Sequence, residues 1–484
     1  MMRRVYISAA HKSSGKTTVS IGLCAALKDR GLRVQPFKKG PDFIDPLWLT
    51  QAAGRPCHNL DFHTMSAAEI GDCFATASQG ADIAVIEGNK GLFDGVALDG
   101  SNSNAALARY LQAPVVLVIN AQGINRGIAP LVIGYRHFDP DLPIAGIILN
   151  RVGGARHEAK LRAVLKAFTD VPVLGALWDS ASAAISERHL GLIPSGEHDG
   201  AAAAVDRLMQ IIRDHVDVGA IAGLGMGELS RTTASPARKH KPDLRIGIPR
   251  DAAFSFYYPG DLEALSAGGA ELVFFDALKD RRLPEVDGLF IGGGFPETQA
   301  GALAANTEMR GAIRAAIEDG LPAYAECGGL MYLCRTLAWR GETHPMVGVL
   351  AADAAMEAKP VGHGYVNLKP TGAHPWWPES TEGASTVVPA HEFHYSRLIN
   401  VAPETVYAYK VARGHGIDGQ NDGIVYKNVL AGYAHLRDVQ ASRWTGRFLD
   451  FVRSHRHAAR ATSVVTSRCC CAPKMAGAPC DARL

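Results

Sequence analysis

Residues 10–17, near the N-terminus, form a candidate phosphate-binding loop. They read Ala-His-Lys-Ser-Ser-Gly-Lys-Thr, which matches the phosphate-binding spacing G-x-x-x-x-G-K-[ST] with Ala10 at the first glycine position. In such a loop backbone N–H groups face a polyphosphate, Lys16 neutralises its β- and γ-phosphates and Thr17 ligates Mg²⁺. A strand before the loop and a helix after it favour ATP binding over a chance Gly-Lys-Thr at a helix start. The predicted ATP-binding residues are Ser14, Gly15, Lys16, Thr17, Thr18 and Lys38.

Acidic residues follow two further predicted strands, over 32–37 and 82–86. Doubly wound sheets place ligands at the carboxyl ends of their parallel strands, so these acids are candidates for binding the metal of a nucleotide site. Taken singly, each is more often a loop or helix-capping residue. Lys38 and Lys39 would face phosphate or a substrate carboxylate. The candidate acids are Asp42, Asp45, Glu87 and Asp94.

A second constellation centres on Cys327, between the apolar run 321–325 and a predicted helix that opens with two glycines. A strand–nucleophile–helix elbow exposes the thiol at a helix N-terminus, where the helix dipole lowers the thiol pKa. The Gly328 N–H would face a developing oxyanion, and Gly293 or Gly294 would supply a second donor. The alternative is an inert buried thiol. His435 is the favoured base, with His391 and His394 as competitors.

The elements that must position these residues alternate between strand and helix. Short β-branched runs such as 114–119 and 144–149 are typical of strands buried on both faces of a parallel sheet, and helical patterns lie between them. The pattern predicts an α/β protein with a doubly wound parallel sheet at its N-terminal end. We expect a first domain over 1–215, a linker over 216–243, a second domain over 244–453 and a disordered tail over 454–484 that carries cysteines.

Composition excludes several classes of protein. The 484 residues are 47% hydrophobic and 20% charged, with a net charge of +2, which argues against nucleic acid or a membrane as partner. The apolar runs are too short to span a bilayer or to form a signal segment. Nine cysteines, an odd count mostly scattered along the chain, favour a reduced cytoplasmic protein. The C-terminal cysteines match no zinc spacing.

Together these motifs resemble the cobyrinic acid a,c-diamide synthase family. The resemblance covers about residues 3–450. It implies an N-terminal ATP-dependent amide synthase, related in fold to dethiobiotin synthetase, followed by a C-terminal class I glutamine amidotransferase domain. The sister cobyric acid synthases differ in two of the strings and are set aside. The strings that carry the resemblance are 14–18, 37–46, 87–95, 292–297, 324–331 and 391–396.

The resemblance implies a division of labour between the two domains. Cys327 would attack glutamine and release ammonia, with His435 activating the thiol. The N-terminal domain would phosphorylate a tetrapyrrole acetate, which ammonia then converts to an amide. Class I domains usually carry a Glu two residues after the histidine, but this chain has Arg437, so the sequence does not show what orients His435. The implied ligand sets are Thr17, Asp45 and Glu87 for the metal, and Asp42, Asp45 and Asp94 for the substrate or intermediate.

Several alternatives remain open. The residues Asn89-Lys90 and the run 101–106 resemble members that act on sirohaem-type macrocycles, and a third group acts on nickel sirohydrochlorin. A dethiobiotin-synthetase-like carboxylase would also use the phosphate loop, but it has no need of Cys327. A P-loop ATPase switch typically has a second lysine where this chain has His11. The sequence also leaves a homodimer open.

Overall fold

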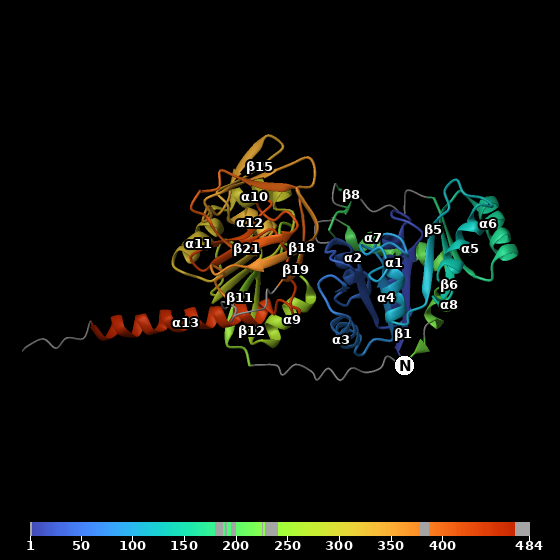
Figure 1. The fold of residues 1–484 in the computed structure, drawn as a ribbon, viewed down its shortest axis with the longest axis horizontal. Helices are drawn as coiled ribbons and strands as arrows, with labels where there is room; N and C mark the ends of the chain where they lie inside the picture. Colours follow the sequence, from blue (N-terminus) through green and yellow to red (C-terminus); the bar gives the residue numbers. More distant parts are fainter. Residues whose placement is uncertain are drawn as a thin grey trace, which may run out of the picture.

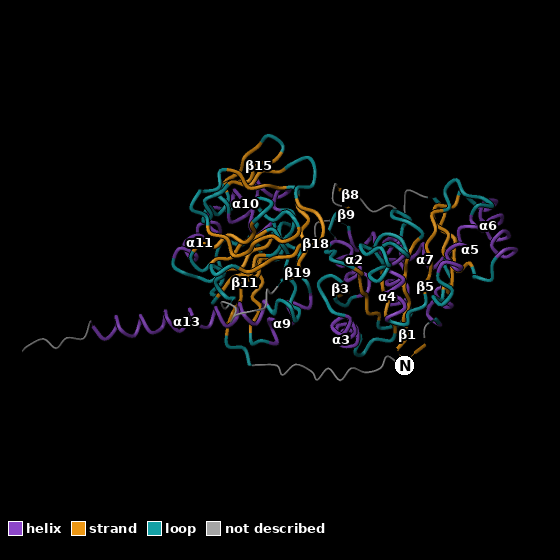
Figure 2. Tube along the Cα trace, in the orientation of Figure 1, coloured by secondary structure: helices purple, strands orange, loops and turns teal. Residues whose placement is uncertain are grey.

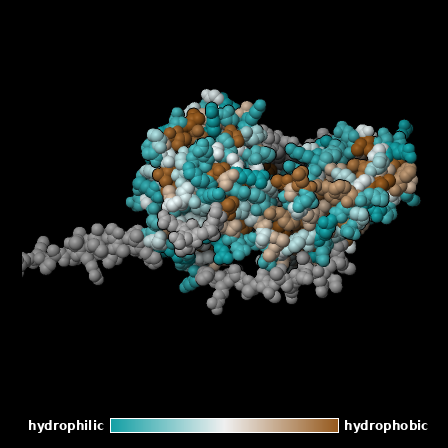
Figure 3. Space-filling view, in the orientation of Figure 1, coloured by the Kyte–Doolittle hydropathy of each residue, from teal (hydrophilic) through white to brown (hydrophobic). Residues whose placement is uncertain are grey.

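The computed structural model describes residues 2–179, 187–188, 191–194, 200–224, 226–227, 241–377 and 387–469. It contains two α/β lobes that lie side by side, with the N-terminal half of the chain in one and the C-terminal half in the other (Figure 1). The face drawn in Figure 3 is mostly hydrophilic, with scattered hydrophobic residues. Among the described residues, none of the helices combines the length and hydropathy that crossing a bilayer requires.

The N-terminal lobe is built on a parallel sheet with the strand order β3-β2-β4-β1-β5-β6-β7. Most side chains of its strands are buried and apolar, as expected for a sheet covered on both faces. The short β10 pairs antiparallel to β1. The strands are β1 (Met2–Ala9), β2 (Val34–Lys39), β3 (His58–Leu60), β4 (Ile83–Glu87), β5 (Val115–Asn120), β6 (Ile144–Val152), β7 (Val173–Trp178) and β10 (Met226–Gly227), with a separate hairpin of β8 (Glu187–Arg188) and β9 (Gly191–Leu192).

Helices cover both faces of this sheet, which makes it doubly wound (Figure 2). One core forms under α1 (Lys16–Asp29), α2 (Ile44–Ala53), α7 (Ala201–His215) and α8 (Val218–Gly223). The core on the opposite face forms under α3 (Ala67–Ala77), α4 (Asn104–Tyr110), α5 (Ile128–Phe138) and α6 (Ala155–Phe168).

We expected a linker over 216–243, but the first residues of this range belong to the N-terminal lobe. Residues 218–223 form α8, whose Val218 and Ile221 are fully buried in the first core. The glycines of this segment indicated a linker, but two apolar side chains three residues apart on a helix share one face and can pack. Residues 228–240, in the middle of the expected linker, lie outside the described residues.

The C-terminal lobe has a mixed sheet with the order β12-β11-β13-β14-β23-β22-β21-β18-β19. The first five of these strands are mutually parallel and the rest are antiparallel. The strands are β11 (Leu244–Pro249), β12 (Ala270–Phe275), β13 (Gly288–Ile291), β14 (Ala323–Glu326), β18 (Gly362–Pro370), β19 (Val388–His394), β21 (Val406–Arg413), β22 (Asn421–Tyr426) and β23 (Val429–Gly432). A smaller sheet contains β15 (Thr336–Trp339), β16 (Glu342–Pro345), β17 (Asp353–Met356) and β20 (Ser396–Ile399).

Cores on the two faces of this sheet also lie under helices. One contains α10 (Ala300–Ala305), α11 (Thr307–Glu318) and α12 (Gly328–Leu333), preceded by the 3₁₀ turn η2 (Pro296–Gln299). The other contains α9 (Pro259–Ala267) and the start of α13 (Trp444–Cys469).

The expected loss of structure at residue 454 does not occur there. Helix α13 continues through 454–469 and projects from the lobe (Figure 1). The sequence His-Ala-Ala-Arg-Ala at 457–461 contains strong helix formers, and these favour a helix even where the sequence has no hydrophobic periodicity. The rest of the expected tail, 470–484 with Cys470, Cys471 and Cys480, lies outside the described residues.

Candidate active site

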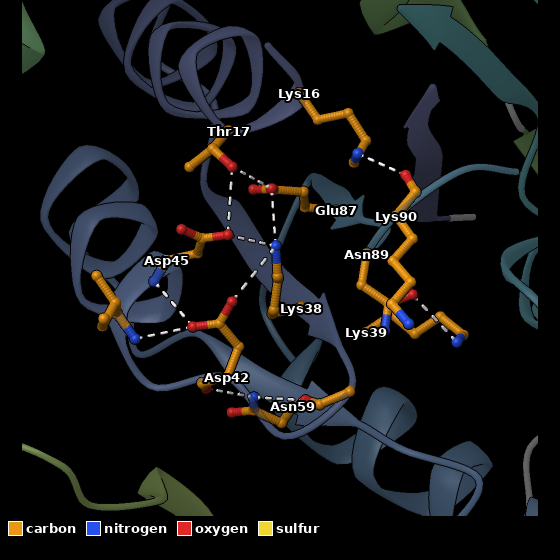
Figure 4. A network of polar contacts seen from close by, with 12 residues as sticks. Lys16, Thr17, Lys38, Lys39, Asp42, Asp45, Asn59, Glu87, Asn89 and Lys90 are labelled. Carbon is orange, nitrogen blue, oxygen red and sulfur yellow. Dashed lines mark hydrogen bonds and ion pairs between the residues drawn. The ribbon is translucent and has the colours of Figure 1, made fainter. Parts of the chain in front are cut away.

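The phosphate loop lies between β1 and α1, as the sequence predicts. Lys16 is the first residue of α1, with Thr17 and Thr18 in the same turn and Gly15 in the left-handed conformation before it. The Ser14 hydroxyl donates to the carbonyl of His11 at 2.8 Å, which closes the loop on itself. The Lys16 ammonium donates to the carbonyl of Lys90 at 2.6 Å (Figure 4). Burial lowers the pKa of Lys16 to about 8.

Beside this loop, three groups converge on the Lys38 ammonium (Figure 4). Its Nζ lies 2.5 Å from Asp45, 2.8 Å from Glu87 and 3.7 Å from Asp42. The Thr17 hydroxyl lies 2.7 Å from Glu87 and 3.2 Å from Asp45. These residues come from β2, β4, α1 and α2, and they meet because the carboxyl ends of parallel strands share one edge of the sheet.

Asp42 and Asp94 also have structural contacts. One oxygen of Asp42 accepts from the backbone N–H groups of Ile44 and Asp45 and so caps the start of α2, while its other oxygen faces Lys38. Asp94 accepts from the N–H of Gly91 at 2.8 Å, and its charge acts on Lys16. Both therefore lie beside the phosphate loop, Asp42 in the acid cluster and Asp94 within its own loop.

In the C-terminal lobe, Cys327 lies at the elbow between β14 and α12. Its backbone has φ 48° and ψ −98°, a strained conformation for a residue with a side chain and one that clusters at functional sites. The Cys327 N–H donates to the carbonyl of Gly432 at the end of the neighbouring β23. His435 follows three residues later, so the thiol and the imidazole stand after two adjacent parallel strands.

The predicted oxyanion donors also gather at this elbow. A Cβ on Gly328 would lie 3.1 Å from the backbone nitrogen of Gly294, so the two backbones are in close contact. Gly294 has φ 155°, and a side chain there would collide with the carbonyl oxygen of Ala253. A Cβ on Gly293 would lie 2.7 Å from the imidazole carbon of His435. Glycine is therefore required where the loop approaches the histidine.

Of the three candidate histidines, His435 is the one whose pKa responds to the Cys327 thiol. Its Nδ1 lies 3.2 Å from the Glu326 carboxylate, and Cys327 and Glu326 both favour the protonated ring. Burial alone would lower the pKa of His435, but these two partners outweigh it and raise the pKa to about 10. The imidazole is therefore a cation at neutral pH.

The other two histidines have different partners. The His391 ring stacks on His435 at 4.9 Å, and its Nδ1 lies 3.2 Å from the Tyr258 hydroxyl. Burial, followed by the charges of His435 and Arg437, lowers the pKa of His391 well below its ordinary value. His394 stacks on Tyr433 at 3.7 Å. Neither has the contacts of a base for Cys327.

A cavity of about 250 Å³ lies between the lobes. Lys39, Asp42 and Asn89 line it from the N-terminal lobe, and Phe256, His391 and His435 line it from the C-terminal lobe, with Phe43 among them. The two predicted catalytic regions, far apart in the sequence, therefore face one shared space.

Comparison with known proteins agrees with this two-part architecture. Residues 7–193 match the model of the CobQ/CobB/MinD/ParA nucleotide binding domain, and residues 245–439 match that of the CobB/CobQ-like glutamine amidotransferase domain. Cobyrinate a,c-diamide synthase of Magnetococcus marinus is 46% identical over 91% of this chain and 95% of its own length. The enzymes of that name from Methanosarcina acetivorans and Archaeoglobus fulgidus are 41% and 40% identical, over 92% of this chain and 95% and 96% of theirs. The chain belongs to the cobyrinate a,c-diamide synthase family.

Membership of the cobyrinate a,c-diamide synthase family confirms the predicted α/β fold class and the prediction of a glutamine-dependent ligase. The nucleotide binding domain confirms the prediction of ATP binding. The match to the glutamine amidotransferase domain argues against the carboxylase and switch ATPase alternatives, because neither needs such a domain.

Two residues of the site were missed by the sequence analysis. Glu326 directly precedes the cysteine, and only the pairing of β14 with β23 shows that its carboxylate reaches His435. Asn104 is fully buried and uses its amide to hold the loop after β4: it accepts from Tyr6 and from the N–H of Asn89, and it donates to the carbonyls of Asn89 and Gly91. A lone Asn at a helix start gives no such signal.

Proposed function

We propose that this protein amidates the a and c acetate side chains of a cobyrinate-type tetrapyrrole, using ATP and glutamine. The observation that carries the proposal is the shared cavity, which His435 lines from the glutaminase side and Asp42 from the nucleotide side. The names and full-length similarity of the relatives support the substrate class.

In the glutaminase half, the Cys327 sulfur attacks the carboxamide carbon of glutamine and a C–S bond forms. The backbone N–H groups of Gly294 and Gly328 would stabilise the oxyanion. His435 donates its proton to the leaving nitrogen, the C–N bond breaks and ammonia departs, leaving a γ-glutamyl thioester. Water then attacks the thioester while His435 takes its proton, and the C–S bond breaks to give glutamate and free Cys327.

In the synthase half, an acetate oxygen of the tetrapyrrole attacks the γ-phosphorus of ATP. An O–P bond forms and ADP leaves. Ammonia then attacks the acyl carbon, the C–O bond to phosphate breaks, and the surplus proton leaves with inorganic phosphate. Lys16 and Lys38 would stabilise charge on the phosphates. ATP is required because a carboxylate is a poor acceptor for an amine.

The acid cluster fits Mg²⁺. One oxygen of Glu87, Oε2, is buried without a hydrogen-bond partner, beside Asp45 and the Thr17 hydroxyl. Among the described residues, no group of three or more His, Cys, Asp and Glu side chains is arranged to hold a metal ion. Magnesium commonly uses one or two carboxylates together with phosphate oxygens and water, so Glu87, Asp45 and Thr17 would suffice. The ion would neutralise charge on the phosphates during transfer.

The test separates the two halves by nitrogen source. Cys327→Ser is expected to abolish amidation with glutamine and to keep amidation with ammonium chloride. Cys334→Ser is the matched control, because Cys334 is also buried on this side of the sheet but its thiol donates to the carbonyl of Leu330. Unchanged glutamine use by Cys327→Ser would refute the amidotransferase assignment.

Lys16→Ala is expected to abolish amidation with either nitrogen source, whereas Lys12→Ala, at an exposed lysine in the same loop, is expected to retain it. If Lys16→Ala stays active, the role of the phosphate loop is wrong.

The substrate is tested directly by incubation with ATP, Mg²⁺ and glutamine, with the products weighed by mass spectrometry. Cobyrinic acid, hydrogenobyrinic acid and sirohaem form the panel, and gain of amides on cobyrinic acid is the expected result. Asn89 lines the cavity, so the residue that resembles sirohaem-type members stands where it could contact a macrocycle. Amidation of sirohaem alone would replace the proposed substrate.

A further inference from the structure

Phe43 connects the two halves of the site through its side chain. It lies directly before α2, between Asp42 and Asp45, but its ring packs against residues of the C-terminal lobe. The centroid of the Phe43 ring lies 5.0 Å from that of His435, 5.4 Å from that of His391 and 4.6 Å from that of Tyr258. Against Phe256 the ring is stacked at 5.2 Å with an interplanar angle of 4°. A residue of the predicted phosphoryl-transfer loop thus touches the predicted glutaminase base.

A second connection joins the same two segments through Asn59. The Arg437 guanidinium, two residues after His435, donates to the carbonyl of Asn59. The Asn59 amide in turn donates to the carbonyls of Gly40 and Asp42, at 2.8 and 2.7 Å. The segment that carries His435 is therefore tied to this loop twice, by the aromatic contact at Phe43 and, just before Phe43, by a chain of hydrogen bonds.

The position of Phe43 also bears on the route of ammonia. Ammonia released beside His435 has to reach the acid cluster, and Phe43 lines the cavity between them together with Phe256 and His391. These three side chains carry no acidic proton that ammonia could take up, although Lys39 and His435 also line the cavity. Because Phe43 lies between Asp42 and Asp45 in the chain, a movement of either acid on ligand binding would also move Phe43.

We propose that Phe43 is a positioning residue that couples glutamine hydrolysis to the state of the acid cluster. Its ring packs on His435 and the adjoining wall of the cavity, and when residues 40–45 engage nucleotide and substrate these contacts shift so that glutamine hydrolysis becomes faster. Coupling of this kind requires that the two states differ in their contacts, and the contacts that change are those of Phe43 with His435 and Phe256. The inference rests on the proposed function, because it takes the acid cluster to be the site of phosphoryl transfer.

The experiment measures glutamate release and amide formation by the full-length protein, with and without ATP, Mg²⁺ and cobyrinic acid. In the unmodified protein we expect ligands to stimulate glutamate release and the two products to be stoichiometric. In Phe43→Ala we expect the stimulation to fall by about fivefold or more, the lower end of typical coupling between sites, with glutamate released in excess of amide. Phe43→Leu keeps apolar bulk and is expected to lie between the two.

Tyr365→Phe is the matched control. It removes another hydrogen bond between the lobes, from the Tyr365 hydroxyl to Asp61 at 2.7 Å, without touching Phe43. Retained stimulation in this control, together with lost stimulation in Phe43→Ala, supports the proposal. Equal loss in Tyr365→Phe, or full stimulation in both Phe43 variants, overturns it and leaves Phe43 as interface packing.

Failure of the proposed function gives a different result. If the unmodified protein forms no amide from glutamine or ammonium on any macrocycle of the panel, the substrate assignment fails. The coupling is then decided by whether ATP and Mg²⁺ alone change glutamate release in the unmodified protein and not in Phe43→Ala.

Discussion

Glu326 Oε2 lies 3.2 Å from Nδ1 of His435, although the two residues are 109 positions apart. The other oxygen, Oε1, accepts from the N–H of Leu436 at 2.9 Å and from the Tyr324 hydroxyl at 2.6 Å. A carboxylate at Nδ1 keeps a proton on that nitrogen and turns Nε2 toward the nucleophile. The residue before the cysteine thus takes the orienting role that Arg437 cannot fill.

Glu326→Gln is expected to reduce glutamine-dependent amidation by about a hundredfold or more, since removing the orienting carboxylate of a related triad costs about 10⁴-fold in kcat. Amidation with ammonium should change little, because that route bypasses Cys327. Glu326→Asp, which retains a carboxylate, should recover part of the glutamine-dependent rate. Equal losses with both nitrogen sources would indicate a structural role for Glu326 instead.

The pKa of His435 predicts the alkaline limit of glutamine hydrolysis. Its folded value of about 10 is raised above the ordinary 6.5, so the protonated ring stabilises the fold fully below about pH 6.5, and this contribution is lost as pH rises through about 10. Above that pH the ring can no longer protonate the leaving nitrogen, so glutamate release should fall. Rates measured from about pH 6 to about pH 11 should show this limb. In Glu326→Gln the limb should move to lower pH, and an unmoved limb would contradict the assignment.

Arg437→Glu restores the residue type usual at this position in class I domains, and we expect it to rescue nothing. Arg437 faces the carbonyl of Asn59 and lies over the Tyr258 ring, with its guanidinium carbon 5.1 Å from the ring centroid. A carboxylate there would leave the Asn59 carbonyl without its donor, at a cost of about 1–3 kcal/mol in unfolding free energy. The double variant Glu326→Gln/Arg437→Glu should be no faster with glutamine than Glu326→Gln. Recovery of activity would show that position 437 can reach His435.

Much of the fold was predictable because parallel strands leave a strong local signal. Runs such as 83–86 and 114–119 are continuous and apolar since both faces of their sheet are covered. The same topology explains why Thr17, Asp45 and Glu87 were expected together: groups that follow parallel strands meet at one edge. Cys327 and His435 follow the same rule, because they come after the adjacent parallel strands β14 and β23.

What the sequence could not show depends on register and on contacts between the lobes. The reach of Glu326 to His435 follows from the pairing of Glu326 with Gly432, and no local pattern encodes that pairing. The contacts of Phe43 with His435 and of Arg437 with Asn59 join the two lobes, so neither lobe's sequence predicts them alone. In the sequence alone, Glu326 beside Cys327 cannot be told apart from any other residue at the end of a strand.

The C-terminal extension is expected to be dispensable. Among the side chains of α13 that the structure describes, which end at residue 456, the last buried one is Val452, and Arg456 pairs with Asp287 at 3.2 Å. Removing 457–484 should therefore leave the melting temperature and the glutamine-dependent rate near those of the full chain. Phe448→Ala is the contrasting variant, because Phe448 is fully buried against Trp376 and its loss should cost about 3–5 kcal/mol. A truncated chain that unfolds as readily as Phe448→Ala would contradict this boundary.

Lys38→Met tests whether the acid cluster is built to hold a cation. Burial alone would lower the pKa of Lys38, but Asp45 and Glu87 raise it well above its ordinary value, so it is charged at neutral pH. Removing it leaves these carboxylates facing one another, which should cost about 3–5 kcal/mol of unfolding free energy. Adding MgCl₂ without nucleotide should restore part of that loss, because a divalent ion can replace the ammonium among the same oxygens.

Lys39→Met is the matched control for this prediction. Lys39 is also buried, and burial lowers its pKa to about 8. Its ammonium donates to the Asn89 amide oxygen at 3.3 Å rather than to a carboxylate, so its loss should cost less and should create no new response to Mg²⁺. Urea unfolding of both variants, with and without MgCl₂, measures the difference. Equal destabilisation, or stabilisation by Mg²⁺ that is no larger in Lys38→Met than in Lys39→Met, would mean that Asp45 and Glu87 do not form the cation site.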